Sequence, residues 1–224
     1  MNPTSIASPN ASTLGPEVVY VADTGPLLCL GGSKKLRDVF KQRCYGKAHW
    51  VVAVREELLH QARGKDARAR AAQAYTGKAA AWLPAAITFS DADESELVVI
   101  KERLEELAKE KEIRTGRAAS THQLAHLGET QSILHARRHK HTLLAHDNDA
   151  RKVASEHGIP TATMIALAQR LVREGHSAKE LANEFQALKL DNIDLGAPFM
   201  GPLDLTPRPN PPIPRQRPSN SSGT

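Results

Sequence analysis

The stretch that decides the fold covers residues 18–27 and reads VVYVADTGPL. Its first five residues are apolar and partly β-branched, which predicts a short buried strand over 18–22. Asp23, Thr24, Gly25 and Pro26 follow directly, and a glycine and a proline at these positions predict that the strand ends in a turn. The sequence therefore predicts a buried strand that finishes on an aspartate.

Strand-like and helix-like segments alternate along the rest of the chain. Further strands are predicted near residues 49–53, 87–89, 142–145 and 161–164. Helices are predicted over 33–42, 54–62, 67–81, 90–115, from 128 onward, over 147–157, and in two C-terminal segments that end near 190. This alternation predicts a three-layer α/β/α fold, in which helices cover both faces of a central, mainly parallel sheet.

Composition is that of an ordinary globular protein. The chain has 224 residues, of which 40% are apolar and 25% charged, and this suits one domain with extensions or at most two small domains. No apolar run approaches the roughly 20 residues of a membrane span. Two cysteines, Cys29 and Cys44, are too few for a disulfide framework. We expect a cytoplasmic protein with no membrane partner and no secretory signal.

The two ends differ in composition from the middle. Residues 1–16 carry no charged side chain and show no periodicity, and seven of the 14 prolines lie within 202–224. We expect disordered tails over 1–16 and 196–224, with one domain and its C-terminal helical extension over 17–195. The net charge is +5, which permits a nucleic-acid partner without requiring one. Three arginines of the C-terminal tail contribute to it, and that tail is either inert or a weak phosphate-binding arm.

Acidic residues stand where the predicted strands end. Asp23 follows the first strand and Asp147 follows the strand 142–145, with Asp149 two positions later. Glu57 lies early in a predicted helix, and Glu129 opens another directly after a glycine expected to allow a sharp turn. Ligands of open α/β sheets bind at the carboxyl ends of the strands, and clustered carboxylates there favour a hard cation such as Mg²⁺ or Mn²⁺. The alternative for each acid alone is a helix cap.

Four segments resemble the acidic motifs of PIN-domain nucleases, and most closely those of VapC-like toxins. They read VADTGPL at 21–27, VREEL at 54–58, LGETQSI at 127–133 and LLAHDNDARKVA at 143–154. The resemblance extends over about residues 18–165. It implies a PIN-like fold, Mg²⁺- or Mn²⁺-dependent hydrolysis of RNA, and frequently a homodimer and an inhibiting antitoxin.

The resemblance also implies roles for individual residues. The catalytic set would be Asp23, Glu57, Glu129 and Asp147, with Glu56 left open as an alternative to Glu57. The metal ligands would be Asp23, Glu129, Asp147 and Asp149, where Asp149 is an alternative to Asp147 or its helper. Thr24 matches a hydroxyl residue beside the metal, and Arg151 and Lys152 would contact substrate. Arg137, Arg138 and Lys140 form, with Arg151 and Lys152, either a phosphate-attracting or a merely exposed basic face.

The chain departs from the family in length and in its histidines. Residues 63–123 look like an insertion, and the helix over 91–112 would be a lid, a dimerisation arm, an antitoxin-docking surface or an ordinary solvated helix. Six of the ten histidines lie between 122 and 146, and His135 and His139 have the i,i+4 spacing of zinc ligands. Without an HExxH motif, solvated or RNA-facing histidines are the preferred interpretation.

The sequence thus predicts a metal-dependent endoribonuclease that forms no covalent enzyme intermediate. The alternative is a non-catalytic PIN-like module that binds RNA or a protein. A receiver-like phosphoryl-transfer domain ranks lower, because it needs a buried lysine after a late strand and the segment directly after 161–164 offers none.

Overall fold

The computed structural model describes residues 18–76, 82–116, 126–195 and 198–205. The predicted N-terminal tail, residues 206–224 and the histidine-containing loop after Gly116 lie outside these ranges.

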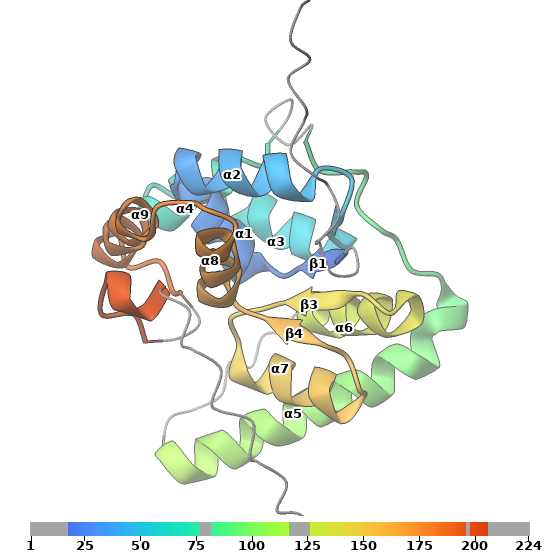
Figure 1. Ribbon diagram of the computed structural model, residues 1–224. Coiled ribbons are helices and arrows are strands. Elements are labelled where there is room, and N and C mark those ends of the chain that lie inside the picture. The colour runs from blue at the N-terminus through green and yellow to red at the C-terminus, as the bar shows by residue number, and fades with distance from the viewer. Residues whose placement is uncertain (1–17, 77–81, 117–125, 196–197, 206–224) are drawn as a thin grey trace, which may run out of the picture.

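A small parallel sheet forms the centre of the molecule (Figure 1). Its strands are β1 (Tyr20–Ala22), β2 (Ala48–His49), β3 (Thr142–Leu144) and β4 (Thr161–Ala162), in the order β2-β1-β3-β4. All three pairings are parallel, which confirms the predicted α/β class and the parallel sheet. The predicted strand at 87–89 is reduced to one parallel bridge between Ile87 and Val51.

Helices account for most of the remaining described chain. They are α1 (Thr24–Gly32), α2 (Lys34–Cys44), α3 (Val52–Gln61), α4 (Ala67–Gln73), α5 (Glu94–Thr115), α6 (Leu127–His139), α7 (Asn148–Glu156), α8 (Met164–Arg173) and α9 (Ala178–Leu190). Short 3₁₀ turns form at η2 (Asp91–Asp93) and η3 (Pro202–Leu205). The predicted start of α2 is confirmed, since the Ser33 hydroxyl accepts a hydrogen bond from the Leu36 amide.

The sheet separates two apolar cores (Figure 1). Tyr20 and Ala22 face the core built with α1–α4, α8, α9 and η3. Val21 and Leu143 face the other core, which includes α5, α6 and α7. Because successive strand residues point to opposite faces, the three residues of β1 suffice to join both layers. The arrangement is consistent with the predicted three layers.

Two predictions from the sequence need correction. The turn predicted at 23–26 is the first turn of α1, where Pro26 is tolerated because the amides of a first turn have no partner within the helix. The boundary predicted at residue 196 is too early, because Phe199 and Leu205 are 2% and 0% exposed against α8 and α9. Among the described residues, no helix is long and apolar enough to cross a membrane.

Candidate active site

The sheet order places a topological switch point between the carboxyl ends of β1 and β3. The chain leaves β1 for β2 on one side and later adds β3 and β4 on the other side. Connections that diverge from two adjacent parallel strands leave an opening between them. Asp23 follows β1 and Asp147 lies three residues beyond β3, so the topology brings both carboxylates to this opening.

Asp23 is a buried carboxylate that does not cap the helix it precedes. It is 6% exposed and occupies the N-cap position of α1, yet its side chain makes no capping hydrogen bond. Burial raises the pKa of Asp23 well above its usual range, and the charges of Glu129, Glu57 and Asp147 raise it further. A backbone hydrogen bond from Thr24 lowers this pKa only in part. The capping explanation therefore does not account for Asp23.

Thr24 connects the first acidic motif to the second. Its buried hydroxyl donates a 2.6 Å hydrogen bond to Glu57 Oε2, and Gln61 Nε2 donates a 2.9 Å bond to Glu57 Oε1. Glu56 instead pairs with Arg55 on the exposed face of α3. Of the two neighbouring glutamates, Glu57 is therefore the one that reaches Asp23.

Gly128 allows the first turn of α6 to approach these acids. A Cβ atom on Gly128 would lie 3.2 Å from Val54 Cγ2 and 3.8 Å from both Asp23 Oδ1 and Glu57 Oε2. Gly128 lies within α6 and does not have a positive φ. The need for a glycine here is therefore explained by the close approach of α6 to the acids, and not by the predicted sharp turn. The residue with a positive φ is His126, at 67°.

Glu129 follows Gly128 in the first turn of α6. Burial raises the pKa of Glu129, and Glu57 and Asp147 raise it further, while its own backbone amide and His126 lower it. The structure thus brings together the four acids of the predicted catalytic set, and Glu57, Glu129 and Asp147 each act electrostatically on Asp23.

Asp147 and Asp149 differ in their contacts. Asp147 is the N-cap of α7, and its Oδ1 accepts hydrogen bonds from the amides of Asp149 and Ala150 at 2.7 and 2.9 Å. Asp147 therefore both caps α7 and belongs to the acidic group. The Asp149 carboxylate instead lies 3.4 Å from Lys111 Nζ on α5, and Asp149 is not among the charges acting on Asp23.

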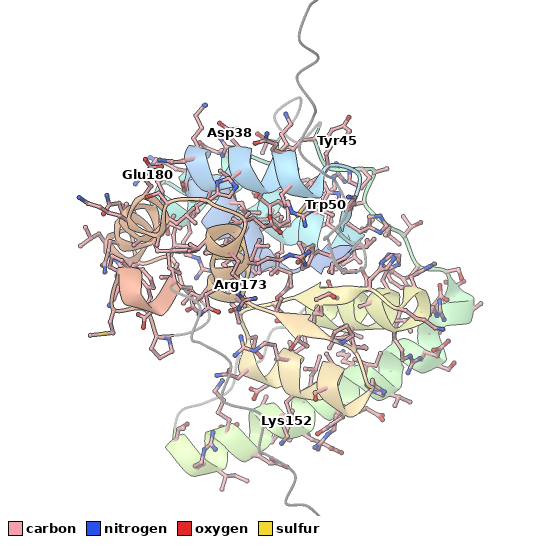
Figure 2. All side chains as sticks on the ribbon, viewed as in Figure 1. Asp38, Tyr45, Trp50, Lys152, Arg173 and Glu180 are labelled. Atoms are coloured by element: carbon pink, nitrogen blue, oxygen red, sulfur yellow. The ribbon has the colours of Figure 1, made fainter. Side chains whose placement is uncertain are left out.

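The predicted basic face is largely engaged in internal contacts. Arg137 and Arg138 form ion pairs with Glu96, and Arg138 also with Asp93. Arg151 donates to the backbone carbonyls of Ala145 and His146. Lys140 is exposed at the end of α6, and Lys152 is exposed on α7 (Figure 2).

Comparison with known proteins gives no assignment. No family model, curated protein or solved structure matches this chain. The likeness to PIN-domain nucleases therefore depends on the four motifs and on the positions of their acids.

The chemistry of the acidic group fits a divalent cation. Four carboxylates supply oxygen ligands, and buried carboxylates without a countercharge are costly, so a cation would relieve their repulsion. Among the described residues, no three of these carboxylates bring ligand oxygens within 4.8 Å of one another. A Mg²⁺ ion here would therefore contact one or two carboxylates directly and the others through its bound waters.

His146 also belongs to this region, although it was not among the predicted site residues. It is 5% exposed, and its ring lies against Gly25, where a Cβ atom would be 3.1 Å from Nδ1. Burial lowers the pKa of His146 to about 4, so the ring is neutral and adds no positive charge beside Asp147. A small residue at position 25 is thus required for this packing.

Proposed function

We propose that the protein is a PIN-like, Mg²⁺- or Mn²⁺-dependent endoribonuclease that hydrolyses RNA phosphodiester bonds. The observation that carries the proposal is Asp23, a buried carboxylate with a raised pKa, no capping role and three other acids acting on it. A purely structural aspartate would gain from a countercharge at this position, whereas Asp23 has one backbone hydrogen bond, from Thr24, and faces three like charges.

Each side chain has a distinct part in the proposal. Asp23, Glu129 and Asp147 would hold the cation, one or two of them directly and the rest through its waters. Glu57, fixed by Thr24 and Gln61, would orient the attacking water. A bound divalent cation lowers the pKa of water and neutralises charge that develops on the phosphate. Asp147 remains oriented because its Oδ1 is tied to the start of α7. Asp149, paired with Lys111, would act only on the periphery of the site.

The test is cleavage of defined RNAs by the full chain with Mg²⁺, Mn²⁺ or a chelator. We expect D23N to reduce metal-dependent cleavage by at least about 100-fold, the scale of losing one group that stabilises the transition state. E56Q is the matched control, because Glu56 contacts Arg55 and should leave cleavage unchanged. D23N should fold at least as stably as the parent, because it removes a buried charge that other acids repel. Equal cleavage by D23N and the parent would refute the assignment.

A second candidate is a non-catalytic PIN-like module that binds RNA or a protein. It is favoured by the distances among the carboxylates, since no three described ones meet within 4.8 Å. RNA binding without cleavage in any of the metals would support it over the nuclease.

The likeness to VapC-like toxins extends the proposal to three further points. They are a small antitoxin partner, a homodimer, and action in the cytoplasm. None of these carries the catalytic argument.

A further inference from the structure

Three histidines from separate segments meet on one face of the sheet. His49 is paired with Val21 in the register of β2 and β1, and His141 lies two residues before Leu143 of β3. Val21 and Leu143 face the core that contains α6, so alternation along the strands places His49 and His141 on that same face. His135 is supplied by α6 itself.

The end of α6 turns the chain so that His141 comes back beside His135. Lys140 adopts the left-handed conformation with φ 55°, and the His141 amide donates a 2.9 Å bond to the Ala136 carbonyl. This is the hydrogen-bond pattern of a helix C-cap, and it fixes the backbone on both sides of the cluster. The ligands are thus held by rigid elements.

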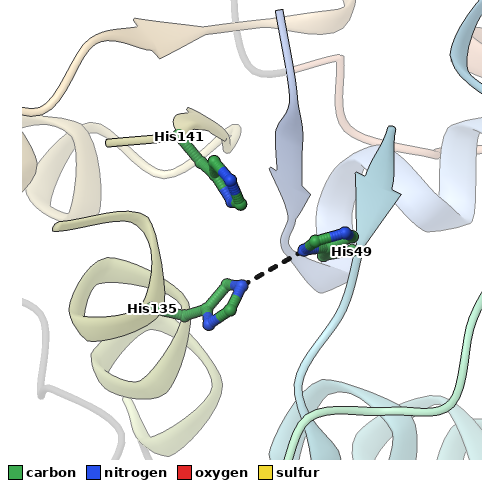
Figure 3. Close-up of side chains that lie close together, drawn as sticks. All are labelled: His49, His135 and His141. Carbon is green, nitrogen blue, oxygen red and sulfur yellow. Dashed lines mark hydrogen bonds between the residues drawn. The ribbon is translucent and has the colours of Figure 1, made fainter. Parts of the chain in front are cut away.

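The three rings point into one shared space (Figure 3). One ring nitrogen of each histidine lies within 4.8 Å of those of the other two, and His49 Nδ1 lies 3.2 Å from His135 Nε2. Two nitrogens bound to a tetrahedral Zn²⁺ at about 2.0–2.1 Å would be roughly 3.4 Å apart. The His49–His135 pair already has this spacing, and small side-chain rotations would bring in His141.

The three rings are neutral near pH 7, and a metal ion would replace the hydrogen bond that joins His49 Nδ1 and His135 Nε2. Burial lowers the pKa of His135 to about 4, and the neighbouring histidines lower it further. The pKa values of His49 and His141 are also lowered, again mainly by burial. Among the described residues, His141 Nδ1 is buried without a hydrogen-bond partner, and this is costly unless something binds it.

We propose that His49, His135 and His141 form a binding site for a borderline transition-metal ion, with Zn²⁺ as the expected occupant and the fourth coordination position open to water. Neutral imidazoles prefer Zn²⁺, Cu²⁺ or Ni²⁺, whereas Mg²⁺ and Mn²⁺ prefer oxygen ligands. The ion would connect β2, α6 and the start of β3.

This site is separate from the acidic group. His135 follows Glu129 by six residues on α6, which is about 9 Å along the helix axis. The two sites also differ in donor atoms, nitrogen in one and oxygen in the other. The proposal therefore stands whether or not the acids support RNA cleavage.

His139 provides a sharp control. Its ring centroid lies 4.4 Å from that of His135 and 5.5 Å from that of His141, but it is exposed and outside the group of three. His176, exposed between α8 and α9, serves as a distant control. Replacing either one changes the histidine content of the chain as much as replacing a ligand does.

The test is calorimetric titration of Zn²⁺ into the untagged, chelator-treated full chain, repeated in the D23N variant to remove binding at the acids. Co²⁺ titration supplies a second readout, because four-coordinate Co²⁺ with nitrogen ligands absorbs visible light far more strongly than six-coordinate Co²⁺ with oxygen ligands. We expect one Zn²⁺ per chain in D23N, together with the strong Co²⁺ absorption.

H49Q, H135Q and H141Q should each weaken Zn²⁺ binding at least about tenfold, since even outer-shell changes cost about 10–100-fold. H139Q and H176Q should bind like the parent. Circular dichroism establishes that each metal-free variant folds, and the half-buried His49 and His141 carry the test if H135Q unfolds. Absence of Zn²⁺ binding would overturn the proposal. The proposal would also be overturned if H139Q weakened Zn²⁺ binding as much as H135Q does. That result would indicate non-specific binding to a histidine-rich surface.

Discussion

At the scale of single residues, the acidic site depends on a few short contacts around Asp23. Burial and the surrounding acids oppose ionisation of this carboxyl group, and a divalent cation would reverse that balance. Thr24 fixes Glu57 from one side and Gly128 gives it room on the other. The site is therefore sensitive to changes as small as one hydroxyl group.

T24V should lower kcat/KM for RNA by about tenfold or more, while T24S should remain close to the parent. The Thr24 hydroxyl donates to Glu57, and a hydrogen bond to a charged group contributes about 1.5–3 kcal/mol. Valine keeps the shape but removes the donor, so Glu57 loses its orientation. Steady-state cleavage kinetics measure the effect, and indistinguishable T24V and T24S rates would contradict the positioning role.

At the scale of elements, α6 carries one acid of the site and α5 packs behind α6. The helix α6 carries Glu129, and its Gln131 accepts a 3.2 Å hydrogen bond from the Ala53 amide at the start of α3. The helix α5 packs on α6 and α7 through Ile100, Leu104 and Leu107. The sequence leaves four alternatives open for this segment. The burial of these three residues agrees best with an ordinary helix of the fold, which is packed on one face and solvated on the other.

L104A should destabilise the protein by about 2–5 kcal/mol, the usual cost of truncating a buried leucine. Leu104 is 0% exposed, whereas Ile113 near the end of the same helix is 85% exposed. I113A should therefore change the free energy of unfolding by no more than about 0.5 kcal/mol. Urea denaturation measures both, and a near-neutral L104A would favour a loosely attached lid.

At the scale of the whole molecule, ion pairs join helices that are distant in sequence. Arg43 of α2 pairs with Glu174 at the end of α8 at 2.9 Å, and Arg170 also contacts Glu174. These arginines hold the pKa of Glu174 below its usual range, with Arg43 the largest favourable cause. Stability from this pair is present above the ordinary glutamate pKa and is lost as the pH falls through the lowered value.

E174Q should cost about 0.5–1 kcal/mol at neutral pH. The difference from the parent should shrink as the pH falls below the ordinary glutamate pKa and vanish below the lowered pKa of Glu174. Denaturation at several pH values measures the difference. D38N, which breaks an exposed pair within α2, serves as the control and should show a smaller change. A deficit in E174Q that persists unchanged at low pH would exclude the ionic explanation.

Local structure could be predicted well from the sequence, whereas contacts between residues far apart in the chain could not. The β1 strand, the Ser33 cap and the parallel sheet followed from residue pattern and turn chemistry. The motif favours Glu57 without excluding Glu56, because the contact of Glu57 with Thr24, 33 residues earlier, is not visible in the sequence.

Three other features were beyond local reasoning for similar reasons. His49 lies 86 residues before its partner His135, so the histidine pattern on α6 suggested only His139. Asp-Thr-Gly-Pro resembles a turn although it opens a helix. Burial of Phe199 depends on α9, which a proline-rich context does not reveal.

If the four acids form a divalent-cation site, the protein binds Mn²⁺ through them. Electron paramagnetic resonance of free Mn²⁺, titrated into the full chain, reports binding without relying on the choice of RNA. We predict that the parent and E56Q take up Mn²⁺, and that D23N and E129Q lose this binding while remaining folded. Uptake of Mn²⁺ by D23N and E129Q equal to that of the parent would contradict the account.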